Sequence, residues 1–257
     1  MARATPSLID QLQHRRALRR WERVAERAEA LPLPALRALR HRAAQLRARL
    51  DRVLFTADAR LTLPRIGSNA FHKPLHSDWA WRPGLWRGPI SPPGVAAAET
   101  KQRFGDEVTL FHDCRISELT VRQVRNTRET DLAPFGLRMD VFNFDGSFLS
   151  LVIDLPEAAV RGLKRRHLVR LSCVVETERP IEIFARLNVR HGPNTEQIVR
   201  ELTLGDEGIV VEFDLAYSNL NEKRVERAWV DLIFEQPSMN QVVLRDVTFS
   251  RRPRAEL

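Results

Sequence analysis

The densest group of reactive side chains in the sequence is formed by His112, Asp113 and Cys114. A cysteine beside a histidine can serve as a nucleophile, and both side chains can bind a transition metal. On a strand, however, His112 and Cys114 lie on one face and Asp113 on the other, and such neighbours seldom reach hydrogen-bond distance. A closed zinc site also needs about four protein ligands. We therefore predict a partly buried pair at a strand end, with no catalytic residue, no metal site and no cofactor.

A row of polar side chains follows the predicted strand 181–190. Apolar and polar residues alternate there, so one face of the strand carries an aromatic ring, two arginines and an asparagine. A tryptophan and an aspartate have the same phase on the predicted strand 228–235. Planar donor groups beside a flat ring can hold a sugar or another polyol. The alternative is an ordinary solvent-facing side, or one covered by a neighbouring segment. The predicted ligand-binding residues are Phe184, Arg186, Asn188, Arg190, Trp229 and Asp231.

The carboxylates allow two further kinds of chemistry. A calcium ion needs about six to eight oxygen ligands, and a glycosidase needs a pair of carboxylates at a fixed separation. The sequence does not place any such pair, and it has no Walker phosphate loop, dinucleotide-binding glycine motif, serine-hydrolase elbow, zinc-protease motif or Cys-x-x-Cys. A structural calcium site remains one of the alternatives. Its oxygens could come from aspartates around one predicted hairpin and near the C-terminus, namely Asp140, Asp145, Asp154 and Asp246.

Strands must position these side chains, because apolar residues recur with a period of two from about residue 106 onward. About ten short strands separated by turn signals predict a mainly β protein, with a jelly-roll-like β-sandwich over residues 106–257. A short helix is expected within 156–166, where a proline would begin it. Cys173 falls in an apolar series and is predicted to be a core thiol.

Residues 61–105 differ in composition from both flanking parts. Six prolines exclude long helices and central strands. Three of the five tryptophans, Trp79, Trp81 and Trp86, lie within eight residues. We interpret this segment as a linker strap whose tryptophan rings pack onto the sandwich, since each ring buries a large apolar area. The alternative is a stacking platform for a sugar or a nucleobase.

The basic excess of the chain lies entirely in residues 1–60. They hold 14 Lys+Arg and 6 Asp+Glu, whereas the rest of the chain holds 27 of each. Prolines at 32 and 34 separate two amphipathic helices, which predicts a basic helical hairpin over residues 7–54. The second helix has an apolar seam with the spacing of a coiled coil, surrounded by arginines and formed by Leu36, Leu39, Ala43, Leu46, Leu50 and Val53.

This hairpin could meet several partners. Its seams could pack on each other or on a second copy of the chain, with the arginines facing water. Nucleic acid or an anionic lipid surface could instead bind the arginines. No early apolar run suits a secretory signal, and none reaches the about 18 residues of a membrane-spanning helix. The sequence therefore predicts no transmembrane segment, and it predicts a cytoplasmic location with reduced thiols.

Two resemblances add to this reading. The stretch from Trp79 to the C-terminus resembles an alphaproteobacterial family without an assigned function, so no site residue carries over from it. The last strand, 244–249, is similar to that of galactose-binding-like jelly rolls, many of which are carbohydrate-binding modules; this implies a jelly roll and a glycan ligand. The first resemblance is carried by Asp-Trp-Ala-Trp-Arg-Pro (78–83), Phe-His-Asp-Cys (111–114), Ala-Pro-Phe-Gly-Leu-Arg (133–138), Phe-Asp-Gly-Ser-Phe-Leu-Ser-Leu (144–151), Asn-Val-Arg-His-Gly-Pro-Asn (188–194), Ala-Trp-Val-Asp-Leu-Ile-Phe-Glu (228–235) and Arg-Arg-Pro-Arg-Ala-Glu-Leu (251–257).

These features predict a non-catalytic binding or scaffold protein. Its β-sandwich would recognise a glycan or a protein partner, and its N-terminal helices would serve assembly or localisation. The first alternative is a protein that associates with nucleic acid or an anionic membrane through the arginine-rich hairpin. The second alternative is an enzyme of unrecognised type.

Overall fold

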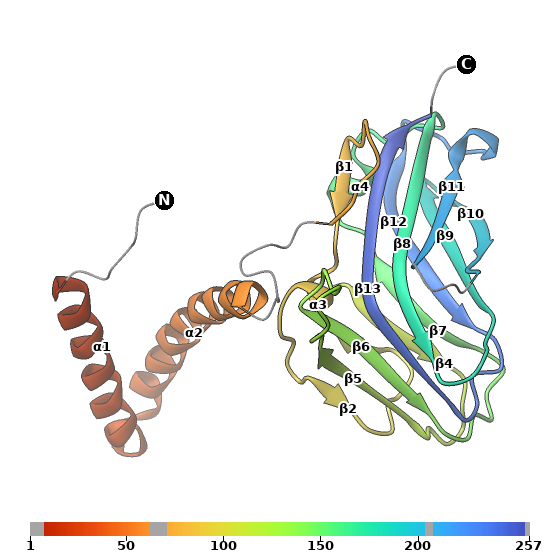
Figure 1. The fold of residues 1–257 in the computed structure, drawn as a ribbon. Coiled ribbons are helices and arrows are strands. Elements are labelled where there is room, and N and C mark those ends of the chain that lie inside the picture. The colour runs from red at the N-terminus through yellow and green to blue at the C-terminus, as the bar shows by residue number, and fades with distance from the viewer. Residues whose placement is uncertain (1–7, 62–70, 204–207, 255–257) are drawn as a thin grey trace. The chain divides into compact units, whose positions relative to one another are not determined.

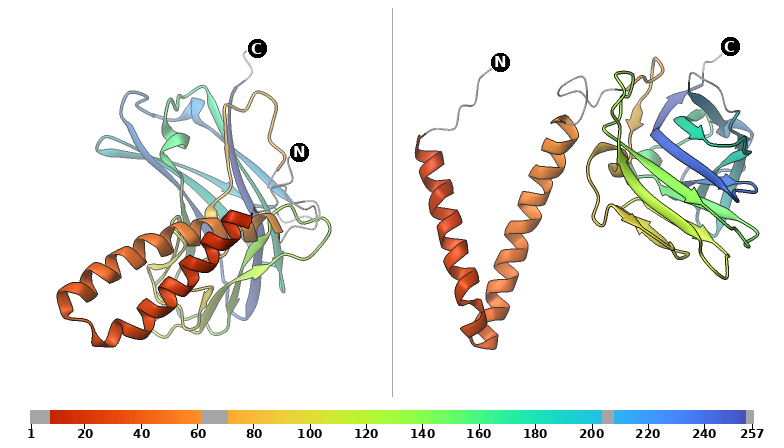
Figure 2. Two further views of the ribbon diagram at one scale, coloured as in Figure 1. Left: turned by 90° about the vertical axis from the view of Figure 1, so that its left-hand side faces the viewer. Right: turned by 60° about the horizontal axis from the view of Figure 1, so that its bottom comes forward.

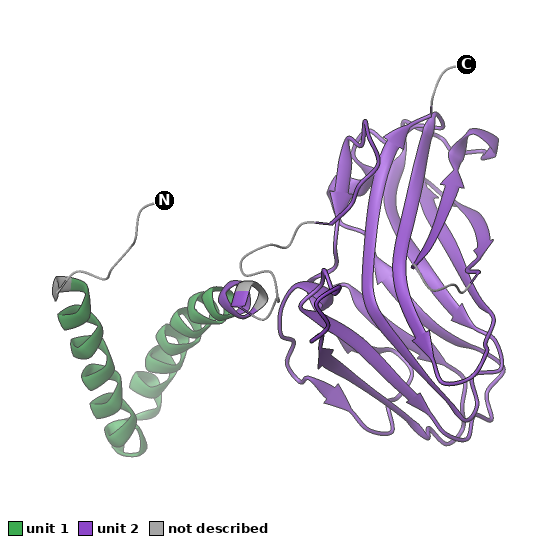
Figure 3. Cartoon of the chain, in the orientation of Figure 1, with its two compact units in different colours: residues 1–54 green, residues 55–257 purple. Residues whose placement is uncertain are grey.

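The computed structural model describes residues 8–61, 71–203 and 208–254, and the chain divides into two compact units, residues 1–54 and 55–257 (Figure 3). The parts of the predicted hairpin and strap that fall on residues 1–7 and 62–70 lie outside the described residues.

The second unit contains two antiparallel sheets that pack face to face (Figure 1). Sheet A has the strand order β11 (Ile209–Asp214), β8 (His167–Thr177), β13 (Asn240–Pro253), β6 (Phe135–Val141), β5 (Leu119–Arg125) and β2 (Gly94–Val95), with β1 (Trp79–Trp81) paired to β13. Sheet B has the order β10 (Asn194–Glu201), β9 (Ile183–His191), β12 (Val225–Phe234), β7 (Leu149–Asp154), β4 (Val108–His112) and β3 (Gln102–Phe104). The prediction of a mainly β protein with a jelly-roll-like sandwich is confirmed.

The chain changes sheet at most steps between successive strands, as in a jelly roll. β6, β8 and β13 belong to sheet A, whereas β7, β9 and β12 belong to sheet B. One exception is the β9–β10 hairpin, where Gly192 has a left-handed φ of 62°. The connections carry three short helical turns: α3 (Gly84–Arg87), α4 (Glu157–Val160) and the 3-10 helix η2 (Leu215–Tyr217). α4 follows Pro156 and is the short helix predicted within 156–166.

The hydrophobic core lies between the two sheets and takes alternate residues of most of the longer strands. In β8, for example, Val169, Leu171 and Cys173 are buried while their neighbours are partly exposed. Burial raises the pKa of the Cys173 thiol to about 12, as expected for the predicted core thiol.

The tryptophans of the predicted strap pack onto the sandwich. Trp86 is fully buried, and its Nε1 donates to the carbonyl oxygen of Leu244 at 2.9 Å. Trp81 stacks against Trp79 and Phe249, with ring centroids 6.4 and 5.9 Å apart. The same segment supplies β1, β2 and β3 to the two sheets, so strand pairing begins well before residue 106. These strands are only two or three residues long, too short to show a period of two in the sequence.

The first unit is helical. It consists of α1 (Leu8–Arg27), the 3-10 turn η1 (Ala28–Ala30) and most of α2 (Leu33–Leu61), as Figure 2 shows. Trp21 and Leu36, which lie near the turn, are partly buried. Farther along α2, Leu46, Leu50 and Val53 are 39, 53 and 64% exposed. The outer half of the seam is therefore not covered by any of the described residues. None of the described helices is long and apolar enough to cross a membrane.

Candidate ligand-binding face

The predicted ligand-binding residues lie on the outer face of sheet B, on the neighbouring strands β9 and β12. The antiparallel register places Arg186 opposite Asp231 and Asn188 opposite Trp229. Opposed residues project from the same side of a sheet, so these four side chains come together. The other neighbour of β9 is β10, and its residue Gln197 stands opposite Asn188. Gln197 therefore joins this group, although the alternation within 181–190 and 228–235 did not point to it.

Asp231 is the centre of a hydrogen-bond network on this face. Its Oδ2 accepts from Nε and Nη2 of Arg186 at 2.8 and 2.7 Å, and from Asn188 Nδ2 at 3.0 Å. Asn188 Oδ1 accepts from Gln197 Nε2 at 3.0 Å. Asp231 and Asn188 are 4% and 1% exposed, whereas Arg186 keeps 37% of its side chain accessible. An alternating row predicts a freely projecting arginine; in the structure, the ion pair with a buried carboxylate fixes Arg186.

Trp229 supplies an aromatic ring beside this network. The guanidinium of Arg227 lies 5.2 Å from the ring centroid and also pairs with Asp154. Asp154 belongs to β7 and stands opposite Trp229. The indole is partly buried, so it can offer only part of its surface to a ligand.

The two remaining predicted residues lie toward the ends of β9. Phe184 lines a recess of about 520 Å³ together with Glu182, Glu235 and other residues of the adjoining loops. Arg190 is exposed and forms an ion pair with Glu226 at 3.3 Å, where both side chains are more than half accessible. The structure therefore assembles the centre of the predicted face and leaves Arg190 at its rim.

The cluster of His112, Asp113 and Cys114 is held by structural hydrogen bonds. His112 Nε2 lies 2.9 Å from the carbonyl oxygen of Ala98, and Nδ1 accepts from the backbone N–H of Cys114 at 3.2 Å. Asp113 accepts from the hydroxyl and backbone N–H of Ser147, and the hydroxyl bond is the main cause of its lowered pKa. Both imidazole nitrogens are thus engaged by the backbone, and the bonds between Asp113 and Ser147 tie the end of β4 to the loop before β7.

The aspartates considered as calcium ligands each have a different arginine partner. Asp246 is largely buried, and burial raises its pKa even though Arg82 pairs with it at 2.7 Å. No group of three or more His, Cys, Asp or Glu side chains within the described ranges is arranged to hold a metal ion. The other three pairs are Asp140 with Arg138, Asp145 with Arg115, and Asp154 with Arg227.

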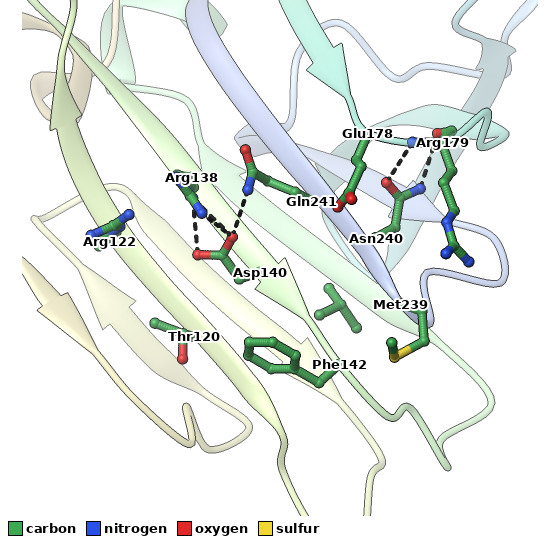
Figure 4. Close-up of a pocket in the computed structure, with 11 residues that line it drawn as sticks. Thr120, Arg122, Arg138, Asp140, Phe142, Glu178, Arg179, Met239, Asn240 and Gln241 are labelled. Carbon is green, nitrogen blue, oxygen red and sulfur yellow. Dashed lines mark hydrogen bonds and ion pairs between the residues drawn. The ribbon is translucent and has the colours of Figure 1, made fainter.

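A second concavity, here called the sheet A recess, has a volume of about 530 Å³ and lies on the outer face of sheet A (Figure 4). β5, β6, β13 and residues 178–179 line it. At its floor, Asp140 accepts from Arg138 Nε at 2.8 Å and from Gln241 Nε2 at 3.0 Å. The polar phase of β5 and β6 could have indicated this face, but only the register brings β13 beside them.

Fold and polar face together define a jelly-roll-like β-sandwich protein with a candidate ligand-binding surface. Residues 1–257, the whole chain, match the model of a family of unknown function (DUF6478), and the chain belongs to that family. None of the curated proteins matches it.

Several solved structures are similar to part of the chain. A family 11 carbohydrate-binding module from Clostridium thermocellum, in complex with a β-1,3-1,4-mixed-linked tetrasaccharide, has 12% identity and a TM-score of 0.39, and the match covers 59% of this chain and 91% of that one. TmCBM61 in complex with β-1,4-galactotriose has 15% identity and a TM-score of 0.35, with 57% and 88% covered. The enzymatically active domain of bacteriophage CBA120 tailspike protein 4 has 9% identity and a TM-score of 0.39, with 56% of this chain and only 19% of the tailspike chain covered. At such TM-scores, function has to be argued from the residues of this chain alone.

Proposed function

We propose that the protein is a non-catalytic binding protein whose sheet B face recognises a glycan. The observation that carries this proposal is the fixed network of Arg186, Asp231, Asn188 and Gln197 beside the indole of Trp229. A polar surface that is already ordered loses little conformational entropy when a ligand binds.

The network leaves guanidinium donors and an amide acceptor for a ligand. Asp231 accepts hydrogen bonds from Nε and Nη2 of Arg186, so Nη1 of Arg186 remains available as a donor. Asn188 accepts a hydrogen bond from the amide nitrogen of Gln197, so Oε1 of Gln197 remains available as an acceptor. A pair of neighbouring sugar hydroxyls offers the matching acceptor and donor, because a hydroxyl can do both. In this proposal Asn188 and Asp231 are positioning residues, while Arg186, Gln197 and Trp229 contact the sugar.

A glycan array followed by titration calorimetry on the full-length protein tests this function. Gln197→Ala removes one neutral hydrogen bond and is expected to weaken binding of the captured glycan about 2- to 12-fold. Trp229→Ala removes the ring and is expected to weaken it roughly tenfold. The matched control is Thr195→Ala, which truncates a polar side chain at the exposed end of β10, the strand that carries Gln197. This variant should bind like the wild type. An array that captures no glycan, or variants that bind as tightly as the wild type, would refute the proposal.

A second candidate function is supported by the exposed seam of α2. If Leu36 occupies the first heptad position, the positions that flank the seam are Arg40, Arg42, Arg47 and Arg49. In a coiled coil of two copies, flanking positions face each other across the interface, and arginine would meet arginine. We therefore favour an anionic lipid surface, where the apolar stripe enters the headgroup and acyl boundary while the arginines reach the phosphates.

Co-sedimentation of the full-length protein with vesicles tests this second function. We expect binding to vesicles of equal phosphatidylglycerol and phosphatidylcholine, and none to phosphatidylcholine alone. Arg42→Gln with Arg49→Gln should weaken binding about 30-fold, since each arginine near such a surface contributes about 1 kcal/mol. The control Arg37→Gln with Arg52→Gln removes equal charge from the far side of the helix and should lose much less. Equal losses in both pairs, or retention on duplex DNA without vesicle binding, would contradict the lipid surface.

A further inference from the structure

We propose that the sheet A recess is a separate binding site for an acidic oligosaccharide, one whose sugar units carry carboxylates. This site lies on the opposite sheet from the sheet B face and does not depend on it.

Arg122 carries an uncompensated positive charge at the recess. The β5–β6 register places Arg122 directly opposite Arg138, and like charges in that position repel each other. Arg138 has an ion-pair partner in Asp140, with Nη2 and Oδ1 at 2.7 Å. The side chain of Arg122 is exposed and forms no ion pair or hydrogen bond with any described residue. A carboxylate bound between the strands would match the planar fork of Arg122 and remove the repulsion.

The far side of the recess is rigid and also has free polar groups. The amide of Asn240, only 5% exposed, accepts from the backbone N–H of Arg179 and donates to its carbonyl oxygen, both at 3.0 Å. This bridge holds the connection between β8 and β9 against β13, as Figure 4 shows. The side chains of Glu178 and Arg179 have no partner within the described ranges. Glu178 can therefore accept hydrogen bonds from sugar hydroxyls, and Arg179 can meet a second carboxylate.

Two apolar side chains lie at the rim of the recess. Phe142 and Met239 are 52% and 55% exposed, although the backbone that carries them is fixed. Met239 N–H donates to the carbonyl oxygen of Phe142 at 2.7 Å, and the Ser238 hydroxyl donates to the same oxygen at 3.1 Å. Met239 has a φ of +53°, a conformation that is unfavourable for a residue other than glycine. Such strain is commonly kept at ligand sites. An exposed ring beside fixed polar groups suits the apolar face of a sugar.

The recess favours an acidic sugar over other anions. Its volume of about 530 Å³ falls within the range of about 300–1,000 Å³ that is common for small-ligand sites. The polar floor of Asp140 and Gln241 disfavours an acyl chain. The carboxylate of Glu178 can accept hydrogen bonds from sugar hydroxyls, donors that a polyphosphate does not offer.

Titration calorimetry of the full-length protein with galacturonic acid trisaccharide tests this site. Arg122→Gln is expected to weaken binding about 10- to 150-fold, because it removes charged hydrogen bonds. Without the probe, its unfolding midpoint should equal or exceed that of the wild type, because the repulsion with Arg138 is gone. Phe142→Ala should also weaken binding. Arg125→Gln makes the same charge change on the same strand outside the recess and should leave binding unchanged.

Four results would overturn the proposal. They are the absence of trigalacturonate binding, equal affinity for the neutral galactose trisaccharide, unchanged binding by Arg122→Gln, and a loss of binding that comes with a clear loss of stability. Gln197→Ala shows which face holds the probe. If trigalacturonate binds in the sheet A recess, this variant should leave its binding unchanged, whether or not the sheet B face binds a glycan.

Discussion

Replacing Arg186 by methionine tests whether the network on sheet B is structural as well as functional. The substitution keeps most of the aliphatic stem but removes both hydrogen bonds to Asp231, at 2.8 and 2.7 Å. Asp231 is 4% exposed, so its carboxylate would keep only the amide of Asn188 as a partner. Breaking a buried ion pair on one side costs about 3–5 kcal/mol. Because Arg186 is itself 37% accessible, water can replace part of its contribution, and we expect a loss of about 2–3 kcal/mol.

Urea unfolding followed by circular dichroism measures this loss. The matched control is Arg190→Met on the same strand, because Arg190 pairs with Glu226 where both side chains are exposed. An exposed pair contributes about 0–1 kcal/mol, so Arg190→Met should stay within that range. Adding Asp231→Asn to Arg186→Met should restore part of the stability, since a neutral amide needs no charged partner. If Arg186→Met costs no more than Arg190→Met, the buried network does not contribute the stability that we infer.

Three further predictions concern other parts of the chain. In a Cys114→Ser background, Cys173 should resist a thiol reagent in the native protein, because burial raises the pKa of its thiol to about 12. It should react after denaturation, whereas labelling of the native protein would show that this part of the core opens readily. Burial, followed by the charge of Arg251, lowers the pKa of His167. The unfolded state therefore takes up a proton first, and the free energy of unfolding should fall as the pH drops below about 6.5. In urea titrations His167→Asn should reduce this fall between about pH 7.5 and 5.5, and an unchanged slope would exclude His167 as its source. Deleting residues 1–54, the first compact unit, should leave a β protein with an unchanged unfolding midpoint, whereas a molten product would show that the helices complete the core.

Much of the fold follows from the order of residue types along the chain. Alternation of apolar and polar residues with a period of two predicts a sandwich, because each strand must present one face to the core. This reasoning places Cys173 in the interior and Arg186 on the outer face of a sheet, as the structure has them. The two prolines after residue 31 likewise predict a break between two helices, which the structure places at residues 28–32.

The partners of these side chains were decided by strand pairing between distant parts of the chain. Asp231 lies 45 residues from Arg186, and only the β9–β12 register makes it a buried ion-pair partner. The strap pattern did not reveal β1–β3, because their strand conformation comes from pairing with longer strands, not from their own sequences.

The sheet A recess and the exposed seam of α2 likewise depend partly on sequence pattern and partly on how the elements pack. Alternation alone assigns Arg122 and Arg138 to an outer face, but register makes them neighbours and the β12–β13 turn places Met239 at the rim. Heptad spacing predicts an apolar stripe on α2, but only the structure shows that its outer half is left exposed by the part of the chain that it describes. The physical reason is that periodicity encodes which side of an element is apolar, whereas the contacts between elements depend on how the whole chain packs.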